Sequence, residues 1–235
     1  MALDVIDQLI REPDFFERLE KLNAAALEEK ALRKKFYETI TEQVKVEFIL
    51  GEVLFQSPAR LRHVEASDNL FELLSVHAKL NDLGIVRHEK LLISLSRNDY
   101  EPDICFFTKE RAASFTPGQM QFPAPDFIVE VLSDSTEERD RGIKMNDYAA
   151  HGVREYWLVH PEHHTVEVYL PTPEGGKFMP SGKYGSGVIE SSVVTGFSIR
   201  VTAIFDRATN VLELRRMVGD ATEKAPVGPG VPPAG

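Results

Sequence analysis

Glu130 is an acid inside an almost unbroken apolar run, "PDFIVEVLSDS" at residues 125–135. The β-branched residues of this run predict a strand that is covered on both faces. A carboxylate buried in such a strand is costly unless its charge is compensated. A bound cation would compensate the charge and give the acid a chemical role, whereas a buried Lys or Arg would make it half of a structural ion pair.

A second acid is needed if Glu130 is to hold a metal ion. Asp126 lies on the same face of the strand but four residues away, about 13 Å at the usual strand rise. Asp103 opens another apolar strand, "PDICFF", and is the better candidate because neighbouring strands can bring two carboxylates together. Two carboxylates suit Mg²⁺, which would lower the pKa of a bound water and stabilise charge on a phosphodiester. Asp103 also follows a proline, so it could simply fix a turn or cap.

Lys144 is the candidate basic residue, in the helix predicted after the Glu130 strand. It lies four residues before Tyr148 and four after Asp140, so the three side chains share a helix face. A lysine here could orient or deprotonate the attacking water, or neutralise the charge that develops on the phosphoryl group. The structural alternative is a solvated lysine that is paired with Asp140 or Asp147.

The order of elements predicts an α/β (α+β) fold, in which a mixed central sheet is flanked by helices. Apolar residues at helical spacing predict an N-terminal helical extension over residues 1–40. A hairpin around Gly51 and a helix over residues 62–83 begin a domain that we expect to span residues 41–215. Residues 216–235 end in "APVGPGVPPAG" and have too little to bury, which predicts a disordered tail.

Composition limits the functional classes. The chain has 235 residues, a hydrophobic fraction of 43% and a formal net charge of −10. Such a charge argues against a protein that coats nucleic acid non-specifically, but does not exclude an enzyme with one local contact surface. The apolar stretches are of strand length and the N-terminus lacks the layout of a signal peptide, so we expect no membrane span. The single cysteine, Cys105, excludes an internal disulfide and a multi-cysteine zinc site, and the expected location is cytoplasmic.

Four segments resemble a large family of bacterial restriction endonuclease domains, long catalogued as a domain of unknown function, within the PD-(D/E)XK nuclease superfamily. They are "EPDICFF", "APDFIVEVLSDST", "DRGIKMNDYAAHGVREYWLVHPEHHTVEVY" and "GFSIRVTAIF", with the best match over residues 102–169. The resemblance implies a restriction-endonuclease-like fold with Asp103 and Glu130 as metal ligands. The superfamily pattern places a lysine two residues after the second acid, where this chain has Leu132. Lys144 matches the place on the following helix to which this family's lysine has moved.

The resemblance also marks secondary candidates. Glu47 in "VEFILGEV" matches an acidic position beside the metal site, and its alternative is an exposed strand glutamate. His63 matches a histidine that begins the first long helix, where it could contact phosphate or only start the helix. Asp126 could bind a second ion or hold the entry of its strand, and Tyr148 shares the helix face of Lys144.

These observations predict a Mg²⁺-dependent endonuclease, with Mn²⁺ as a substitute metal, that hydrolyses phosphodiester bonds in DNA. A homodimer would let two sites cut two strands. The main alternative is an interaction or nucleic-acid-binding module with a nuclease fold and weak or no catalysis, which the acidic charge and Leu132 favour. A two-carboxylate glycosidase fits less well, because such sites lie in open clefts and use no lysine.

Overall fold

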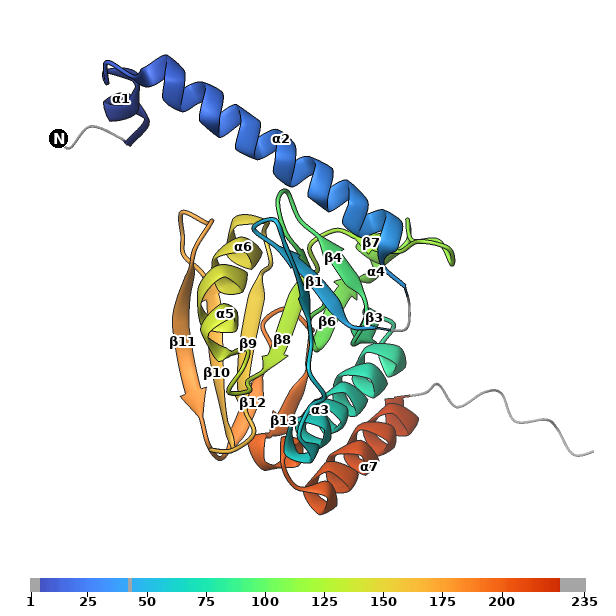
Figure 1. Cartoon of the computed structure of the whole chain (residues 1–235). Helices are drawn as coiled ribbons and strands as arrows, with labels where there is room; N and C mark the ends of the chain where they lie inside the picture. The colour runs from blue at the N-terminus through green and yellow to red at the C-terminus, as the bar shows by residue number, and fades with distance from the viewer. Residues whose placement is uncertain (1–4, 42–43, 225–235) are drawn as a thin grey trace, which may run out of the picture. The chain divides into compact units, whose positions relative to one another are not determined.

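The computed structural model describes residues 5–41 and 44–224 (Figure 1). The described residues form two compact units, with the division between Gln56 and Ser57. The first unit contains two helices and a hairpin: α1 (Val5–Ile10), α2 (Phe15–Thr39), β1 (Val46–Ile49) and β2 (Glu52–Phe55). The predicted N-terminal helical extension is therefore present as α1 and α2.

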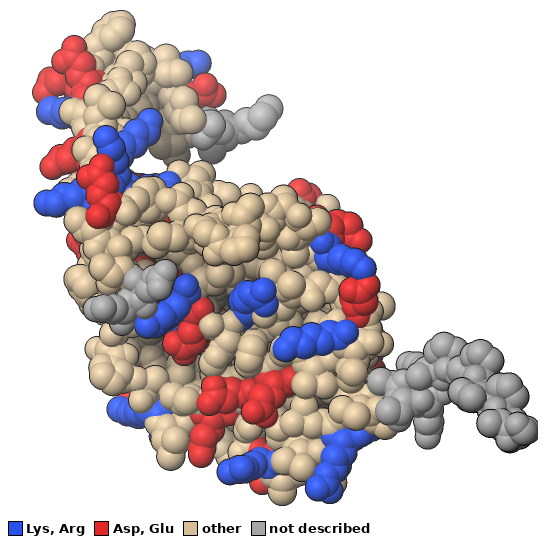
Figure 2. Space-filling view, turned by 90° about the vertical axis from the view of Figure 1, so that its right-hand side faces the viewer, with Lys and Arg blue, Asp and Glu red and all other residues tan. Residues whose placement is uncertain are grey.

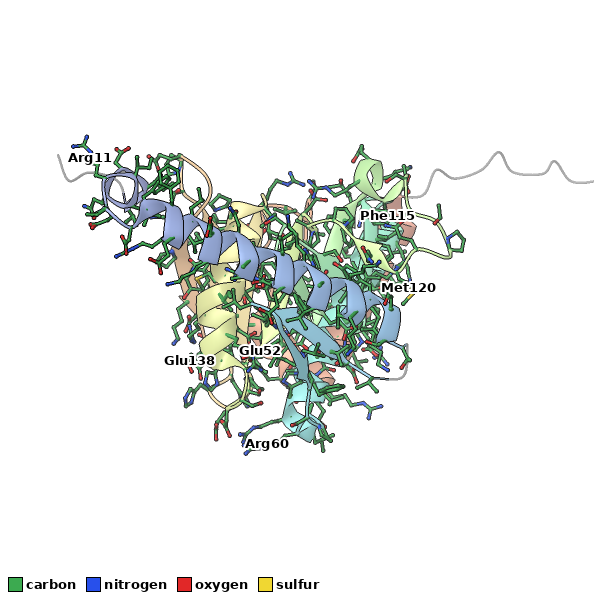
Figure 3. All side chains as sticks on the ribbon, turned by 45° about the horizontal axis from the view of Figure 1, so that its top comes forward. Arg11, Glu52, Arg60, Phe115, Met120 and Glu138 are labelled. Atoms are coloured by element: carbon green, nitrogen blue, oxygen red, sulfur yellow. The ribbon has the colours of Figure 1, made fainter. Side chains whose placement is uncertain are left out.

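The long helix α2 forms because its sequence is rich in strong helix formers such as Ala, Leu, Glu and Lys. Pairs of opposite charge four residues apart, such as Arg18 with Asp14, add to its stability. Figure 3 shows side chains projecting from α2 along its whole length. Near its end, the ring of Phe36 packs against Phe48 of the hairpin at a centroid distance of 5.5 Å.

The hairpin turns through two residues that both have positive φ, Leu50 at 52° and Gly51 at 88°. Two left-handed residues in a two-residue loop make the turn that best matches the twist of paired strands. Gly51 adopts such a backbone without the penalty that a Cβ atom brings.

The second unit is built on a six-stranded sheet with the order β11-β10-β9-β8-β6-β3. Only the β8–β9 pair is parallel, and the other neighbours are antiparallel. This is the predicted mixed sheet. Its strands are β3 (Gly84–His88), β6 (Ile104–Thr108), β8 (Phe127–Val131), β9 (Glu155–His160), β10 (Thr165–Pro171) and β11 (Phe178–Tyr184).

Short elements complete this unit. Strand β4 lies between β5 and β7, and β12 pairs with β13. The loop that carries Phe115 and Met120 follows the brief helix α4 (Figure 3). The bounds are β4 (Leu92–Ser94), β5 (Asp99–Tyr100), α4 (Lys109–Ala112), β7 (Gln121–Phe122), β12 (Val188–Glu190), β13 (Ser198–Arg200) and a 3₁₀ turn (Val201–Ile204).

Helices cover both faces of the six-stranded sheet. On one face, α3 (Leu61–Leu80) and α7 (Arg207–Lys224) border a core to which the strands contribute Ile104, Val129 and Trp157. The other face meets the segment that joins β8 to β9: α5 (Glu137–Arg139), a π-helical turn (Asp140–Lys144) and α6 (Met145–Ala150), drawn in yellow in Figure 1. A parallel pair needs such a crossover connection.

The C-terminal boundary differs from the prediction. We expected residues 216–235 to lack structure, but α7 continues to Lys224, and residues 225–235 lie outside the described part of the chain. Met217 is buried in the core, and Arg216 bonds to Glu213 and Asp220. These contacts stabilise a helical turn that composition alone does not indicate. Within the described residues, no helix is both long and apolar enough to cross a bilayer.

Candidate active site

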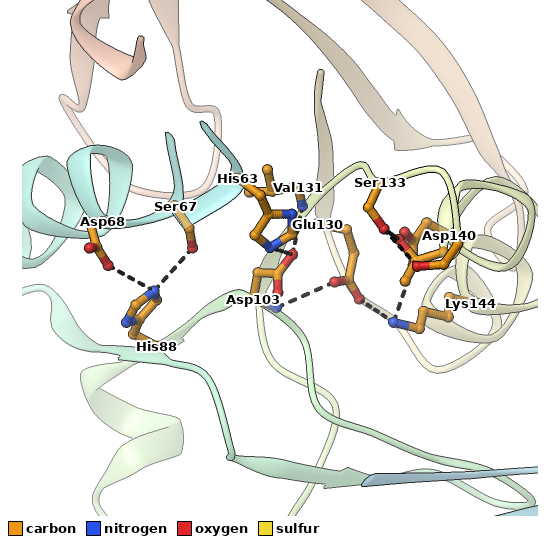
Figure 4. A network of polar contacts seen from close by, with 12 residues as sticks. His63, Ser67, Asp68, His88, Asp103, Glu130, Val131, Ser133, Asp140 and Lys144 are labelled. Atoms are coloured by element: carbon orange, nitrogen blue, oxygen red, sulfur yellow. Dashed lines mark hydrogen bonds and ion pairs between the residues drawn. The ribbon is translucent and has the colours of Figure 1, made fainter. Parts of the chain in front are cut away.

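Asp103 and Glu130 meet where the ladder between β6 and β8 ends. The register pairs Ile104 with Val129, so Asp103 and Glu130 are the next residues across the two strands. Directly opposite residues of antiparallel strands project from the same face. Their carboxylates replace backbone acceptors here: the Asp103 N–H donates to Glu130 Oε2 at 3.3 Å, and the Val131 N–H donates to Asp103 Oδ2 at 2.8 Å (Figure 4).

Lys144 reaches the same carboxylate from the helical connection. Its Nζ lies 3.1 Å from Glu130 Oε1 and 3.2 Å from Asp140 Oδ1. The Tyr148 hydroxyl donates to Glu130 Oε1 at 2.9 Å. Lys144 ends the π-helical turn, an irregularity that is frequent at functional sites. The predicted set Asp103, Glu130, Lys144 and Tyr148 is thus one connected cluster.

The charged groups of this cluster are buried, where a charge is costly unless it is compensated. Glu130 and Lys144 are each 2% exposed, Asp140 is 1% exposed and Asp103 is 5% exposed. Burial raises the pKa of the Asp140 carboxyl, and the Lys144 ammonium partly offsets this. The cluster holds three buried carboxylates and one buried ammonium, which pairs with Glu130 and Asp140, so two negative charges are in excess when these four groups are ionised.

His63 approaches the cluster from the first turn of α3. Its Nε2 lies 3.6 Å from Asp103 Oδ2, and its side chain is 13% exposed. One helical turn later, Ser67 Oγ lies 3.0 Å from His88 Nε2, and the acid Asp68 lies 3.6 Å from the same nitrogen. Figure 4 shows Asp68, Ser67 and His88 as a second group of polar contacts, separate from those of the two central acids.

Asp126 lies apart from this cluster and has other partners. Its Oδ2 accepts a 2.8 Å hydrogen bond from the Thr108 N–H, and Arg154 donates to its Oδ1 at 2.9 Å. Arg111 lies 3.6 Å from Oδ2. Of the two roles considered for Asp126, these contacts support the one that holds the entry of its strand. Glu47 lies in β1 of the first unit and is only 1% exposed, so the alternative of an exposed strand glutamate is wrong.

Some residues of the cluster could not be recognised in the sequence. Ser67 had one usable signal, its position one helical turn after His63, whereas nothing local indicates that β3 brings His88 to it. The ring of Tyr100 faces Lys144, with Nζ 5.9 Å from its centroid. The sequence indicates only that Asp140 shares the helix face of Lys144, because its burial depends on the tertiary fold.

The donor chemistry of the two central acids fits a hard divalent cation. Among the described residues, no group of three or more His, Cys, Asp and Glu side chains is arranged to hold a metal ion. Mg²⁺ often takes only one or two protein carboxylates and fills its other positions with water and phosphate. Asp103 and Glu130 supply two carboxylates from adjacent strands, and each carboxylate oxygen can accept more than one bond.

Comparison with known proteins agrees with this fold. Residues 33–202 match the Uma2 family, which is described as "Putative restriction endonuclease". Among solved structures, the chain resembles a putative nuclease belonging to DUF820 from Anabaena variabilis, with 18% sequence identity and a TM-score of 0.62. The match covers 73% of this chain and 96% of that one. A search of the curated proteins found no match.

Proposed function

The chain belongs to the Uma2 restriction endonuclease family, and on that premise we propose that it is a metal-dependent nuclease that hydrolyses phosphodiester bonds in DNA. The reaction needs a site that can gather positive charge around a phosphate and an attacking water. The buried cluster at the end of β6 and β8 is the part of the described chain that supports this chemistry best.

One observation carries the proposal: the acids of the cluster outnumber its buried base. A structural ion pair would need one carboxylate for Lys144, but Asp103, Glu130 and Asp140 are all present and buried. Buried charge of one sign is costly unless it is compensated. A divalent cation beside Asp103 and Glu130 would offset this excess.

The residues take separate roles in this proposal. Asp103 and Glu130 would hold Mg²⁺, with Mn²⁺ as a substitute, and the ion would supply an acidic bound water and a charge for the phosphodiester. Lys144 lies close enough to orient that water, and Tyr148 fixes the Glu130 oxygen that it bonds. His63, whose Nε2 lies 3.6 Å from Asp103 Oδ2 at the edge of the cluster, would contact a phosphate oxygen.

Substitution of Glu130 by Gln tests the assignment. The amide keeps the size of the side chain but removes its charge, so we expect cleavage of plasmid DNA in Mg²⁺ to fall by at least about 10²-fold. Glu167→Gln is the matched control, because Glu167 is a carboxylate of the same sheet that pairs with Arg141 and Lys183. A Glu130→Gln protein that is folded by circular dichroism and cuts as fast as the wild type would refute the proposal.

A binding module with the same fold is the second candidate. It is favoured by the hydrogen bonds that Glu130 already makes through both oxygens, to Lys144, Tyr148 and the Asp103 N–H. In that case Asp103 and Glu130 would only accept backbone N–H groups where the pairing of β6 and β8 ends. Titration with Mn²⁺ distinguishes the two functions, because a binding module would bind no Mn²⁺ at Asp103 and Glu130.

The DNA substrate, a homodimer and a cytoplasmic location complete the proposal. Figure 2 shows basic and acidic side chains interspersed over the face that carries α3 and α7, so DNA contact through a continuous basic surface is not expected on that face.

Two sites in a dimer would cut both strands of a duplex. Light scattering after size-exclusion chromatography measures the oligomeric state. The ratio of linear to nicked plasmid product reports whether one strand or both strands are cut.

A further inference from the structure

Lys144 is shared between two buried carboxylates that come from different elements. Glu130 belongs to strand β8, and Asp140 begins the π-helical turn that Lys144 ends. The two ion-pair distances from Nζ are nearly equal, 3.1 Å to Glu130 and 3.2 Å to Asp140. Nζ donates a hydrogen bond to Glu130 Oε1, whereas Asp140 Oδ1 is buried without a hydrogen-bond partner among the described residues. Asp140 thus holds an acceptor that the lysine does not fully use.

The lysine lies close to an oxygen that a metal ion would need. Nζ and the Tyr148 hydroxyl both bond to Glu130 Oε1. A divalent ion on the Glu130 carboxylate would repel an ammonium at this distance. Lys144 has somewhere to move, because Asp140 lies beside it and the ring of Tyr100 faces Nζ and favours a cation.

We propose that Lys144 is an exchangeable counter-ion: it neutralises Glu130 until a divalent cation binds, and Asp140 then holds it. Asp140 is therefore a positioning residue, which keeps the displaced ammonium next to the reaction centre. This inference rests on the proposed function, because it assumes that the cation binds at Asp103 and Glu130. It gives the third buried acid a role that neither the ladder nor metal binding requires.

The exchange predicts coupled effects on metal affinity. We measure Mn²⁺ binding to the full-length protein by electron paramagnetic resonance, without substrate. Lys144→Met removes the competing cation, so Mn²⁺ should bind about tenfold more tightly than to the wild type. Asp140→Asn removes the carboxylate that would hold the displaced ammonium, so Mn²⁺ should bind about tenfold more weakly. In the double variant, the Asp140 substitution should have no further effect, because the lysine that it positions is absent.

Asp147→Asn is the matched control. This acid lies three residues after Lys144 in the same connection, and its carboxylate accepts hydrogen bonds from Asn98 and Tyr100. It should leave the Mn²⁺ affinity within about twofold of the wild type. If a thermal melt shows that Lys144→Met does not fold, the Mn²⁺ affinities of Asp140→Asn and Asp147→Asn are compared instead. Asp140→Asn adds no buried charge, because a neutral amide replaces the carboxylate.

Three results would overturn the exchange. Asp140→Asn could leave the affinity unchanged, it could weaken binding equally in the Lys144→Met background, or Lys144→Met could weaken binding. Each of these, with Mn²⁺ bound to the wild type, would leave the proposed nuclease intact. A wild type that binds no Mn²⁺ at all would instead remove the metal-dependent function, and the exchange with it.

Discussion

Two Pro–Asp pairs open two neighbouring strands, and their carboxylates lie in opposite surroundings. Asp103 precedes β6 and Asp126 precedes β8, and because these strands are antiparallel the two acids lie at opposite ends of one ladder. Each carboxylate accepts a 2.8 Å hydrogen bond from the last backbone N–H of the neighbouring strand, Val131 for Asp103 and Thr108 for Asp126. Their structural role is therefore the same.

The two acids differ in the charges around them. Asp126 is flanked by the guanidinium groups of Arg154 and Arg111, whose side chains are 52% and 37% exposed. Asp103 instead lies opposite Glu130, a second buried acid. The comparison teaches that two acids can make the same backbone contact and still differ in the charges beside them. The two arginines compensate Asp126, whereas Asp103 faces an acid, and in the proposed function a cation would compensate that pair.

The largest expected difference between the two acids is in catalysis. Asp103→Asn should lower the initial rate of Mg²⁺-dependent plasmid cleavage by about 10²–10³-fold, the loss typical for a group that stabilises charge in the transition state. Asp126→Asn should leave the rate within about threefold, because its charge serves only the two arginines. Rates at saturating Mg²⁺ measure both. Equal losses in the two variants would show that the two ends of the ladder do not differ in function.

Stability should respond with opposite signs. In both Asn variants the side-chain oxygen still accepts the backbone N–H, so only the charge is lost. Asp126→Asn should lower the free energy of unfolding by about 1–2 kcal/mol, less than for a fully buried pair because both arginines keep contact with water. Asp103→Asn should raise it by up to about 1 kcal/mol in EDTA, since like charges across a ladder repel. Urea unfolding measures both, and a loss of stability in Asp103→Asn would contradict the assumed repulsion.

Local sequence was sufficient for much of this site. The apolar strand around Glu130, the separation from Asp126 and the helix face shared by Lys144 and Tyr148 follow from side-chain periodicity. These short-range rules also predict the mixed sheet and its flanking helices. Side-chain periodicity does not tell which strand lies beside the Glu130 strand, because the strand order is set by contacts distant in sequence. The pairing of Asp103 with Glu130 therefore does not follow from local sequence.

Side-chain periodicity does not predict which charged residues surround Asp126. Arg111 comes from α4, and Arg154 from the residue just before β9, so only the folded sheet brings them to this acid. The π-helical turn and the extent of α7 have the same origin, since packing overrides local propensity there. What the sequence lacks is therefore the partner of each charge, which decides between an ion pair and a metal ligand.

Glu167 extends the comparison to an acid that is compensated by two bases. Hydrogen bonds from Arg141, and then from Lys183, lower the pKa of its carboxyl to about 2 from a usual 4.5. Because the pKa of Glu167 is lower in the folded than in the unfolded protein, its ion pairs stabilise the fold. This stabilisation is fully present above about pH 4.5 and is lost as the pH falls toward about 2. Glu167→Gln should therefore cost about 1 kcal/mol at pH 7 and almost nothing near pH 2. Urea unfolding at several pH values measures the difference, and a constant difference across this range would contradict the ion-pair role.

Arg154 gives the smallest and most specific test. It is one of two guanidinium groups beside Asp126, and half of its side chain is exposed to water. Arg154→Gln should therefore lower the free energy of unfolding by only about 0.5 kcal/mol, as is usual for a solvated pair. In the Asp126→Asn background the same substitution should cost nothing, because the charge that it compensates is absent. An undiminished cost in that background would mean that Arg154 acts through packing, and that Arg111 alone compensates the structural acid.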